Sequence, residues 1–164
     1  MPPPVPEHLL DQADGLTTDD ARQTDLRRAI SNSYYALFHF ALTAAADMVV
    51  GADQRATPRY SLVYRSVDHA RLRALCSQVR ATNPQNLAVV PKDGFGKIAD
   101  FARLTFNLYE LRNLADYDPS NEFELSEAKV AVFHAKQAIR FFQEGALEQQ
   151  QLFLTLLLFK SRPA

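Results

Sequence analysis

The segment Leu108–Pro119 contains the residues of this chain that are best suited to chemistry. It reads Leu-Tyr-Glu-Leu-Arg-Asn-Leu-Ala-Asp-Tyr-Asp-Pro. Ile98, Phe101, Thr105, Leu108, Leu111 and Ala115 recur at three- and four-residue steps, which predicts one buried face of a helix. Arg112 falls in the same sector, and Asp116 follows one turn later. A charged side chain on a buried face needs a partner or a function.

Two interpretations of Arg112 and Asp116 follow from their types and spacing. Residues four apart on a helix can form an ion pair, and this alone accounts for both. Alternatively, Arg112 holds a phosphate or a developing oxyanion, because its guanidinium carries a fixed fork of donors and stays charged at any working pH. The sequence leaves both open.

A second set of polar residues lies at helical spacing earlier in the chain, namely Arg28, Ser31, Tyr35 and His39. Their separations of three, four and four residues place them in one stripe beside an apolar one. The stripe either faces a cleft, with His39 as candidate general base, or is an ordinary solvated helix face. We interpret the other histidines, His8, His69 and His134, as surface or packing residues.

Other templates for chemistry are missing. The sequence has no His-Glu-x-x-His zinc helix, nucleophile elbow, EF-hand loop or Cys-x-x-Cys pair, and it has one cysteine, so we expect neither a metal nor a cofactor. Gly94-Phe95-Gly96-Lys97 lacks the spacing and the hydroxyl residue of a phosphate loop. A net charge of −1 provides no whole-molecule field, so contact with RNA would have to be local.

The elements that position these residues are predicted to be helices throughout. Long stretches of 3.6-residue periodicity and only five glycines indicate an all-α fold, an antiparallel bundle of four to five helices. We divide the chain into an N-terminal segment (1–18), a bundle (19–146) and an apolar C-terminal extension (147–164). The predicted helices cover 7–13, about 20–50 with a cap from 17–20, 60–80 with a break near Asp68, 96–116, and 122 onward until Gly145. The stretch Ala81–Gly96 is expected to be irregular.

The end of the chain is more apolar than one helix face requires. Leu152, Leu154 and Leu156 broaden the stripe, and Phe133 and Phe141 project away from it, which favours a homodimer interface. The apolar window Leu152–Phe159 is too short to cross a bilayer. The opening Met-Pro-Pro-Pro-Val-Pro is unlike a secretory signal. We therefore expect a cytoplasmic protein without membrane contact.

Two blocks of the sequence resemble the HEPN superfamily of helical bundles. The first is Asp25-Leu-Arg-Arg-Ala-Ile-Ser-Asn-Ser-Tyr-Tyr-Ala-Leu-Phe-His39, and the second is Leu111-Arg-Asn-Leu-Ala-Asp-Tyr-Asp-Pro119. They are most similar to the branch with Tyr-Tyr-Ala-x-Phe-His and Arg-x-x-Ala-Asp-Tyr-x-Pro motifs. The resemblance covers about Asp19–Gln143. It implies a homodimeric bundle of the kind found in toxin–antitoxin and antiphage ribonucleases and in partners of small nucleotidyltransferases.

In active members of that family, an Arg and a His four to six residues later form a metal-independent RNA-cleaving centre across the dimer. Here Arg112 matches the arginine, but Tyr117 stands where the histidine would be, and a phenol with an ordinary pKa of about 10 is a poor general base. The resemblance therefore implies a module that binds itself, a nucleotidyltransferase-type protein or RNA through Arg112, Asn113, Asp116 and Tyr117. The alternative is a metal-independent endoribonuclease in which His39 or Tyr117 replaces the imidazole.

Overall fold

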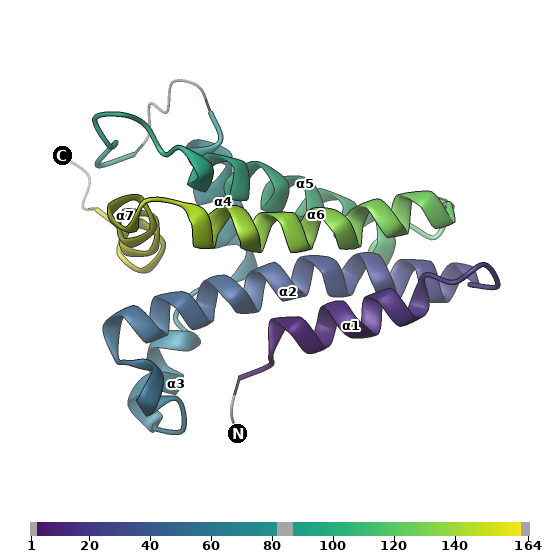
Figure 1. The fold of residues 1–164 in the computed structure, drawn as a ribbon, viewed down its shortest axis with the longest axis horizontal. Coiled ribbons are helices and arrows are strands. Elements are labelled where there is room, and N and C mark those ends of the chain that lie inside the picture. Colours follow the sequence, from purple (N-terminus) through teal and green to yellow (C-terminus); the bar gives the residue numbers. More distant parts are fainter. Residues whose placement is uncertain (1–2, 82–86, 162–164) are drawn as a thin grey trace.

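The described part of the chain is built from helices alone. The computed structural model describes residues 3–81 and 87–161, and within these ranges it contains no strand. The all-α prediction is therefore confirmed. In chain order (Figure 1), the elements are α1 (Pro6–Leu16), α2 (Gln23–Val49), the 3-10 helix η1 (Ala52–Gln54), α3 (Pro58–Tyr64), α4 (His69–Val79), α5 (Lys97–Tyr117), α6 (Leu125–Glu144) and α7 (Leu147–Leu158).

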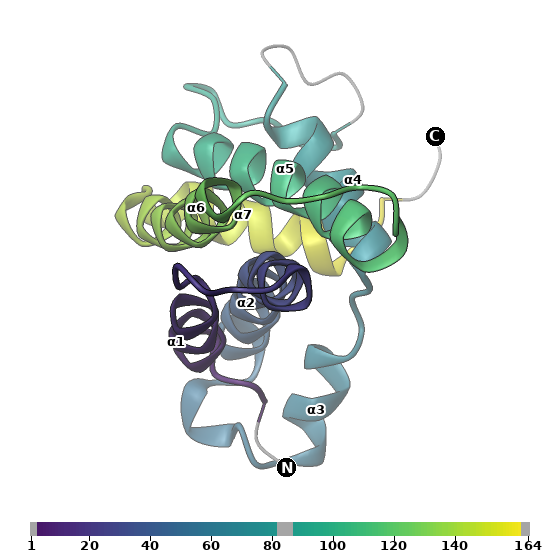
Figure 2. The same ribbon diagram turned by 90° about the vertical axis from the view of Figure 1, so that its right-hand side faces the viewer.

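Helix α2 is the central element of the bundle. It contacts α1, α3, α5, α6 and α7, and the long axes of α1, α2, α5 and α6 run along the same direction (Figure 1). The periodic residues Ile30, Tyr34 and Leu37 are fully buried, as the predicted apolar stripe requires. Seen along these axes (Figure 2), α3 and α4 lie on opposite sides of α2. The middle of α2 is thus enclosed by other helices.

The start of α2 differs from the prediction. Its N-cap is Arg22, not a residue of the polar 17–20 cluster. The Arg22 backbone N–H donates to the Asp25 carboxylate, as the N3 side chain of a capping box requires, and the guanidinium pairs with the same carboxylate. Thr18 instead donates to Asp20 within the preceding turn. The other end agrees with the sequence, because α2 stops at Val49 and Gly51 follows with a positive φ of 107°.

The segment between α2 and α5 breaks where the sequence predicted a break. Helix α3 ends at Tyr64 and α4 begins at His69, and the Asp68 side chain caps α4 by accepting from the Arg71 N–H at 2.8 Å. Residues 87–96 of the predicted irregular connection form no helix, and residues 82–86 lie outside the described residues. Helices α3 and α4 are therefore two short elements, of which α3 packs on α2 and α4 packs on α5 and α7.

Helix α7 folds back across one end of the bundle. It is seen end-on in Figure 1 and lengthwise in Figure 2. The turn contains Gly145, where an added Cβ would lie 2.7 Å from Ile98 Cδ1, so a larger residue would require the Ile98 side chain to shift. Phe153, Leu154 and Leu157 are buried inside the molecule, which accounts for part of the apolar excess without a second copy. The homodimer and the division into three segments remain predictions.

The loop between α5 and α6 is held by the first turn of α2. The Arg27 guanidinium donates to the carbonyls of Ala115 at 2.8 Å, Asp118 at 3.0 Å and Asn121. Gln23 exchanges two hydrogen bonds with the Phe123 backbone, at 2.7 and 3.0 Å. The last carbonyls of a helix lack intrahelical donors, and a cation there also complements the helix dipole. Arg27 therefore fixes the end of α5 against α2.

No helix in the described ranges combines the length and the apolar content that crossing a membrane would need.

Removing the Arg27 side chain should destabilise the fold. We expect Arg27→Ala to lower the free energy of unfolding by about 2 kcal/mol, because hydrogen bonds from a charged group are worth roughly 1.5–3 kcal/mol. The neighbouring Arg28 is exposed, and Arg28→Ala should change stability by less than about 0.5 kcal/mol. Urea denaturation followed by circular dichroism measures both. Equal midpoints for the two variants would contradict this role of Arg27.

Candidate functional site

Arg112 lies inside the bundle, on the face that helical phase predicts. The residue is 5% exposed. Four tyrosine rings surround its guanidinium carbon, with centroids at 4.9 Å for Tyr34, 5.1 Å for Tyr109, 5.5 Å for Tyr35 and 6.0 Å for Tyr117. An aromatic face attracts a cation within about 6 Å, and the attraction grows when water is excluded. Rings from α2 and α5 thus enclose the charge.

The polar contacts of Arg112 are few. One terminal nitrogen lies 3.8 Å from Asp116 Oδ2, and its Nε has no hydrogen-bond partner among the described residues. The other carboxylate oxygen of Asp116 accepts a hydrogen bond from the buried hydroxyl of Ser31 on α2. The side chain of Asp116 is 26% exposed, so water reaches it. The ion pair expected from the spacing is present, and the four rings cover more of the guanidinium than the carboxylate does.

A row of partly buried rings leads away from this point towards α3. The Tyr35 and His39 rings are 6.4 Å apart with planes inclined by 26°, and His39 and Tyr64 are 6.1 Å apart and inclined by 6°. His39 Nδ1 and the Tyr64 hydroxyl share a hydrogen bond of 2.5 Å. On the α4 side, His69 packs 3.9 Å from the Phe38 ring, and its Nδ1 is 2.9 Å from the Tyr34 hydroxyl.

Burial determines the charge state of these rings. It lowers the pKa of His39, with a smaller contribution from His69. Burial also lowers the pKa of His69, and the nearby Arg112 charge adds to this effect. Burial raises the pKa of Tyr64 to about 12. Because each change favours the uncharged form, both imidazoles and the phenol are neutral near pH 7.

The structure brings together part of the predicted set. Ser31, Tyr35, Asp116 and Tyr117 all lie against Arg112 or its carboxylate partner. The remaining three residues do not contact the guanidinium. His39 is separated from it by the Tyr35 ring, while Arg28 is exposed and Asn113 partly buried, and neither makes a side-chain hydrogen bond with another described residue. The roles assigned to these side chains remain predictions.

Sequence reasoning missed four residues of this cluster. Tyr109 precedes Arg112 by three positions, and this spacing places both on one helix face. Tyr34 falls on the apolar stripe of α2 by helical spacing, although its hydroxyl is hydrogen-bonded to His69. Tyr64 reaches the cluster because α3 packs on α2, and His69 reaches it because the start of α4 meets Phe38 of α2. No local spacing signals these contacts.

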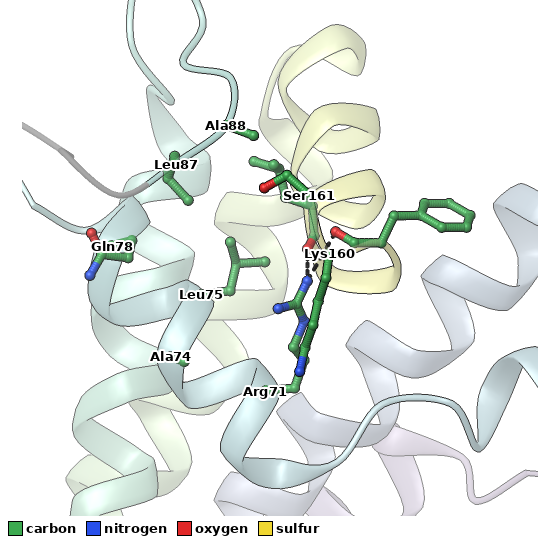
Figure 3. A pocket seen from close by; sticks show the side chains of 10 residues that line it. Arg71, Ala74, Leu75, Gln78, Leu87, Ala88, Lys160 and Ser161 are labelled. Carbon is green, nitrogen blue, oxygen red and sulfur yellow. Dashed lines mark hydrogen bonds between the residues drawn. The ribbon is translucent and has the colours of Figure 1, made fainter. Parts of the chain in front are cut away.

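Two hollows lie near helix ends rather than over Arg112. One, of about 320 Å³, lies between α4 and the end of α7 (Figure 3). Its Arg71 donates to the carbonyls of Leu156, Leu157 and Phe159, so this guanidinium caps α7. A second, open hollow is bordered by Asp116 and Tyr117. Within residues 3–81 and 87–161, no group of three or more His, Cys, Asp or Glu could hold a metal ion.

Comparison with known protein families, curated proteins and solved structures finds no match to this chain.

Arg112 should contribute strongly to stability. We expect Arg112→Ala to lower the free energy of unfolding by about 3 kcal/mol, near the low end of the roughly 3–5 kcal/mol typical of a broken buried pair, because Asp116 stays hydrated. Arg112→Met keeps the contact with the rings, so it should lower the free energy of unfolding by less than Arg112→Ala does. Arg140→Ala on the surface of α6 serves as the control. A thermal melt of Arg112→Ala that matches the wild type would contradict the enclosure.

The two imidazoles should make stability depend on pH. Because their pKa values are lowered in the folded state, the unfolded chain binds more protons below the ordinary histidine pKa of about 6.5. The contribution of the two neutral imidazoles to the free energy of unfolding is therefore fully present above that pH. It decreases as the pH falls below it. Urea midpoints at neutral and mildly acidic pH should differ, and the double variant His39→Gln/His69→Gln should narrow the difference.

The matched control for this pH dependence is His8→Gln, which changes an exposed histidine of α1. It should keep the wild-type difference between the two midpoints. A difference that persists unchanged in the double variant would assign the effect to other groups.

Proposed function

We propose that this protein is a HEPN-like helical bundle that acts by binding, as a homodimer or with a nucleotidyltransferase-type partner of a toxin–antitoxin or defence system. The observation that carries the proposal is the enclosure of Arg112, which is 5% exposed and surrounded by rings of its own chain. A guanidinium held in this way is not presented to a phosphate. We therefore assign Arg112, which matches the family's catalytic arginine, a role in stabilising the fold.

The surroundings of Arg112 also lack a base suited to RNA cleavage. Such a reaction needs a cation and a general base at the same phosphate. His39 is hydrogen-bonded to Tyr64 and lies beyond the Tyr35 ring. Tyr117 is 73% exposed, but it is a phenol and not an imidazole. These contacts support a binding role over the endoribonuclease alternative.

The surface that we assign to self-association lies on α5 and α6, which pack side by side (Figure 1). Four large apolar or aromatic side chains on these two helices are strongly exposed, at 42% for Leu114, 73% for Tyr117, 49% for Val130 and 56% for Phe133. Exposed apolar groups of this kind mark contact surfaces, and aromatic residues are enriched in such interfaces. We assign this surface to a second copy of the chain, because a twofold axis would place the same apolar groups of both copies against each other.

Light scattering coupled to size exclusion tests the proposal. We expect a dimer for the wild type and a monomer for Leu114→Ser/Phe133→Ser, because the double variant removes apolar area from the contact. The matched control is Leu62→Ser, whose side chain is 74% exposed. It lies on α3, which Figure 1 shows apart from α5 and α6. This control should remain a dimer.

Two results would contradict the proposed function. The first is a wild-type protein that remains monomeric at high concentration and in the presence of a nucleotidyltransferase-type partner. The second is strong RNA cleavage in EDTA that is lost in Arg112→Lys, which would instead support the metal-independent endoribonuclease.

A further inference from the structure

The hollow between α4 and the end of α7 has features of a site for a small molecule (Figure 3). Its volume of about 320 Å³ falls within the roughly 300–1,000 Å³ that is typical of ligand pockets. The described residues that line it include two cations, Arg71 and Lys160, and neither an aspartate nor a glutamate. The hollow therefore combines a suitable size with an excess of positive charge.

No carboxylate neutralises these two cations. Neither Arg71 nor Lys160 has an ion-pair partner among the described residues. Arg71 donates through Nε and one terminal nitrogen to three carbonyls at the end of α7, which leaves its Nη1 without a hydrogen bond among the same residues. These carbonyls offset part of the Arg71 charge, because a helix C-terminus carries about half a negative charge. The hollow thus keeps a net positive charge, which attracts an anion.

The nearest acid belongs to a neighbouring hollow of about 450 Å³. Arg71, Ala74 and Lys160 line both hollows, and Asp68 lines only the neighbouring one. The Asp68 carboxylate accepts a hydrogen bond of 2.8 Å from the Arg71 backbone N–H, so it is held as the cap of α4. An anion in the first hollow would therefore meet the two cations without facing a lining carboxylate.

Aliphatic side chains line the hollow beside the cations. Leu75 is 7% exposed, and Leu87 and Leu156 are partly buried. In Figure 3 the Lys160 side chain lies along that of Arg71, and Leu75 and Leu87 lie to one side of this pair. An inorganic anion would contact the cations and leave the leucines exposed to water. A ligand that covers both kinds of surface has a negative head and an aliphatic body.

We propose that the hollow between α4 and α7 binds a small aliphatic carboxylate. The carboxylate lies between Arg71 Nη1 and the Lys160 ammonium group, because its two oxygens can accept from two charged donors. The aliphatic part covers Leu75, Leu87 and Leu156, and this burial favours a chain over a bare anion. The site shares no residue with the α5–α6 surface assigned to self-association.

An NMR titration of methyl-labelled protein with octanoate tests this site, since octanoate joins one carboxylate to an unbranched aliphatic chain. We expect saturable shifts of the methyl signals of Leu75, Leu87 and Leu156. Octanamide keeps the chain without the charge and should bind about fivefold more weakly. Acetate keeps the charge without the chain and should bind at least about tenfold more weakly, because burial of about two CH₂ groups already accounts for that factor.

Two pairs of variants separate the charge from the space. Lys160→Gln should weaken octanoate binding about fivefold, the upper range for an exposed ion pair, whereas Lys129→Gln removes the same charge from the surface of α6 and should keep the wild-type affinity. Ala74→Leu fills the hollow and should abolish binding, whereas Ala74→Ser leaves the space open and should retain it. Thermal melts check that each variant is folded. Arg71 stays unchanged because it caps α7.

Four outcomes would overturn the inference. They are the absence of saturable shifts at the three leucines, equal affinity for octanamide and octanoate, equal loss of affinity in Lys160→Gln and Lys129→Gln, and unchanged binding by folded Ala74→Leu. Equal affinity for acetate and octanoate would also contradict it, because the hollow would then attract any anion. Since light scattering measures the oligomeric state separately, failure here is distinguishable from failure of the proposed self-association.

Discussion

The packing of α2 against α5 depends on how the charge of Arg112 is accommodated. A buried cation is costly unless attraction within the protein replaces its hydration, and here the single carboxylate partner is 3.8 Å away. The faces of four tyrosines, two on α2 and two on α5, supply that attraction. The Ser31 hydroxyl then ties the Asp116 carboxylate to α2, and Arg27 fixes the backbone that follows. The first half of α2 and the last turns of α5 therefore form one structural unit.

This arrangement separates the enclosed charge from the exposed apolar and basic side chains. The buried Arg112 serves packing, whereas Leu114 and Phe133 are exposed on α5 and α6 and Arg59 is exposed on α3. The ring row connects the two regions, since Tyr35 contacts both Arg112 and His39, and His39 contacts Tyr64.

Helical phase was sufficient to place the centre of the site. The burial of Arg112 follows from three- and four-residue spacing, whereas only Ser31 and Tyr35 of the predicted polar stripe meet Arg112 or Asp116. Helix ends near Gly51, Gly145 and Pro119 were also predictable, because glycine and proline restrict the backbone locally. Contacts between segments that are far apart in the sequence were not predictable in this way. His69 and Tyr64 join the cluster only through the packing of α3 and α4, and the direction of α7 after Gly145 determines which leucines are buried.

The most direct test of the enclosure is the NMR signal of the Arg112 Nε–H, assigned by its loss in Arg112→Lys. Rings that enclose the guanidinium should shift this proton upfield and exclude water, so we predict a displaced signal that exchanges slowly with solvent. A signal at the position and exchange rate of an exposed arginine such as Arg28 would contradict the account.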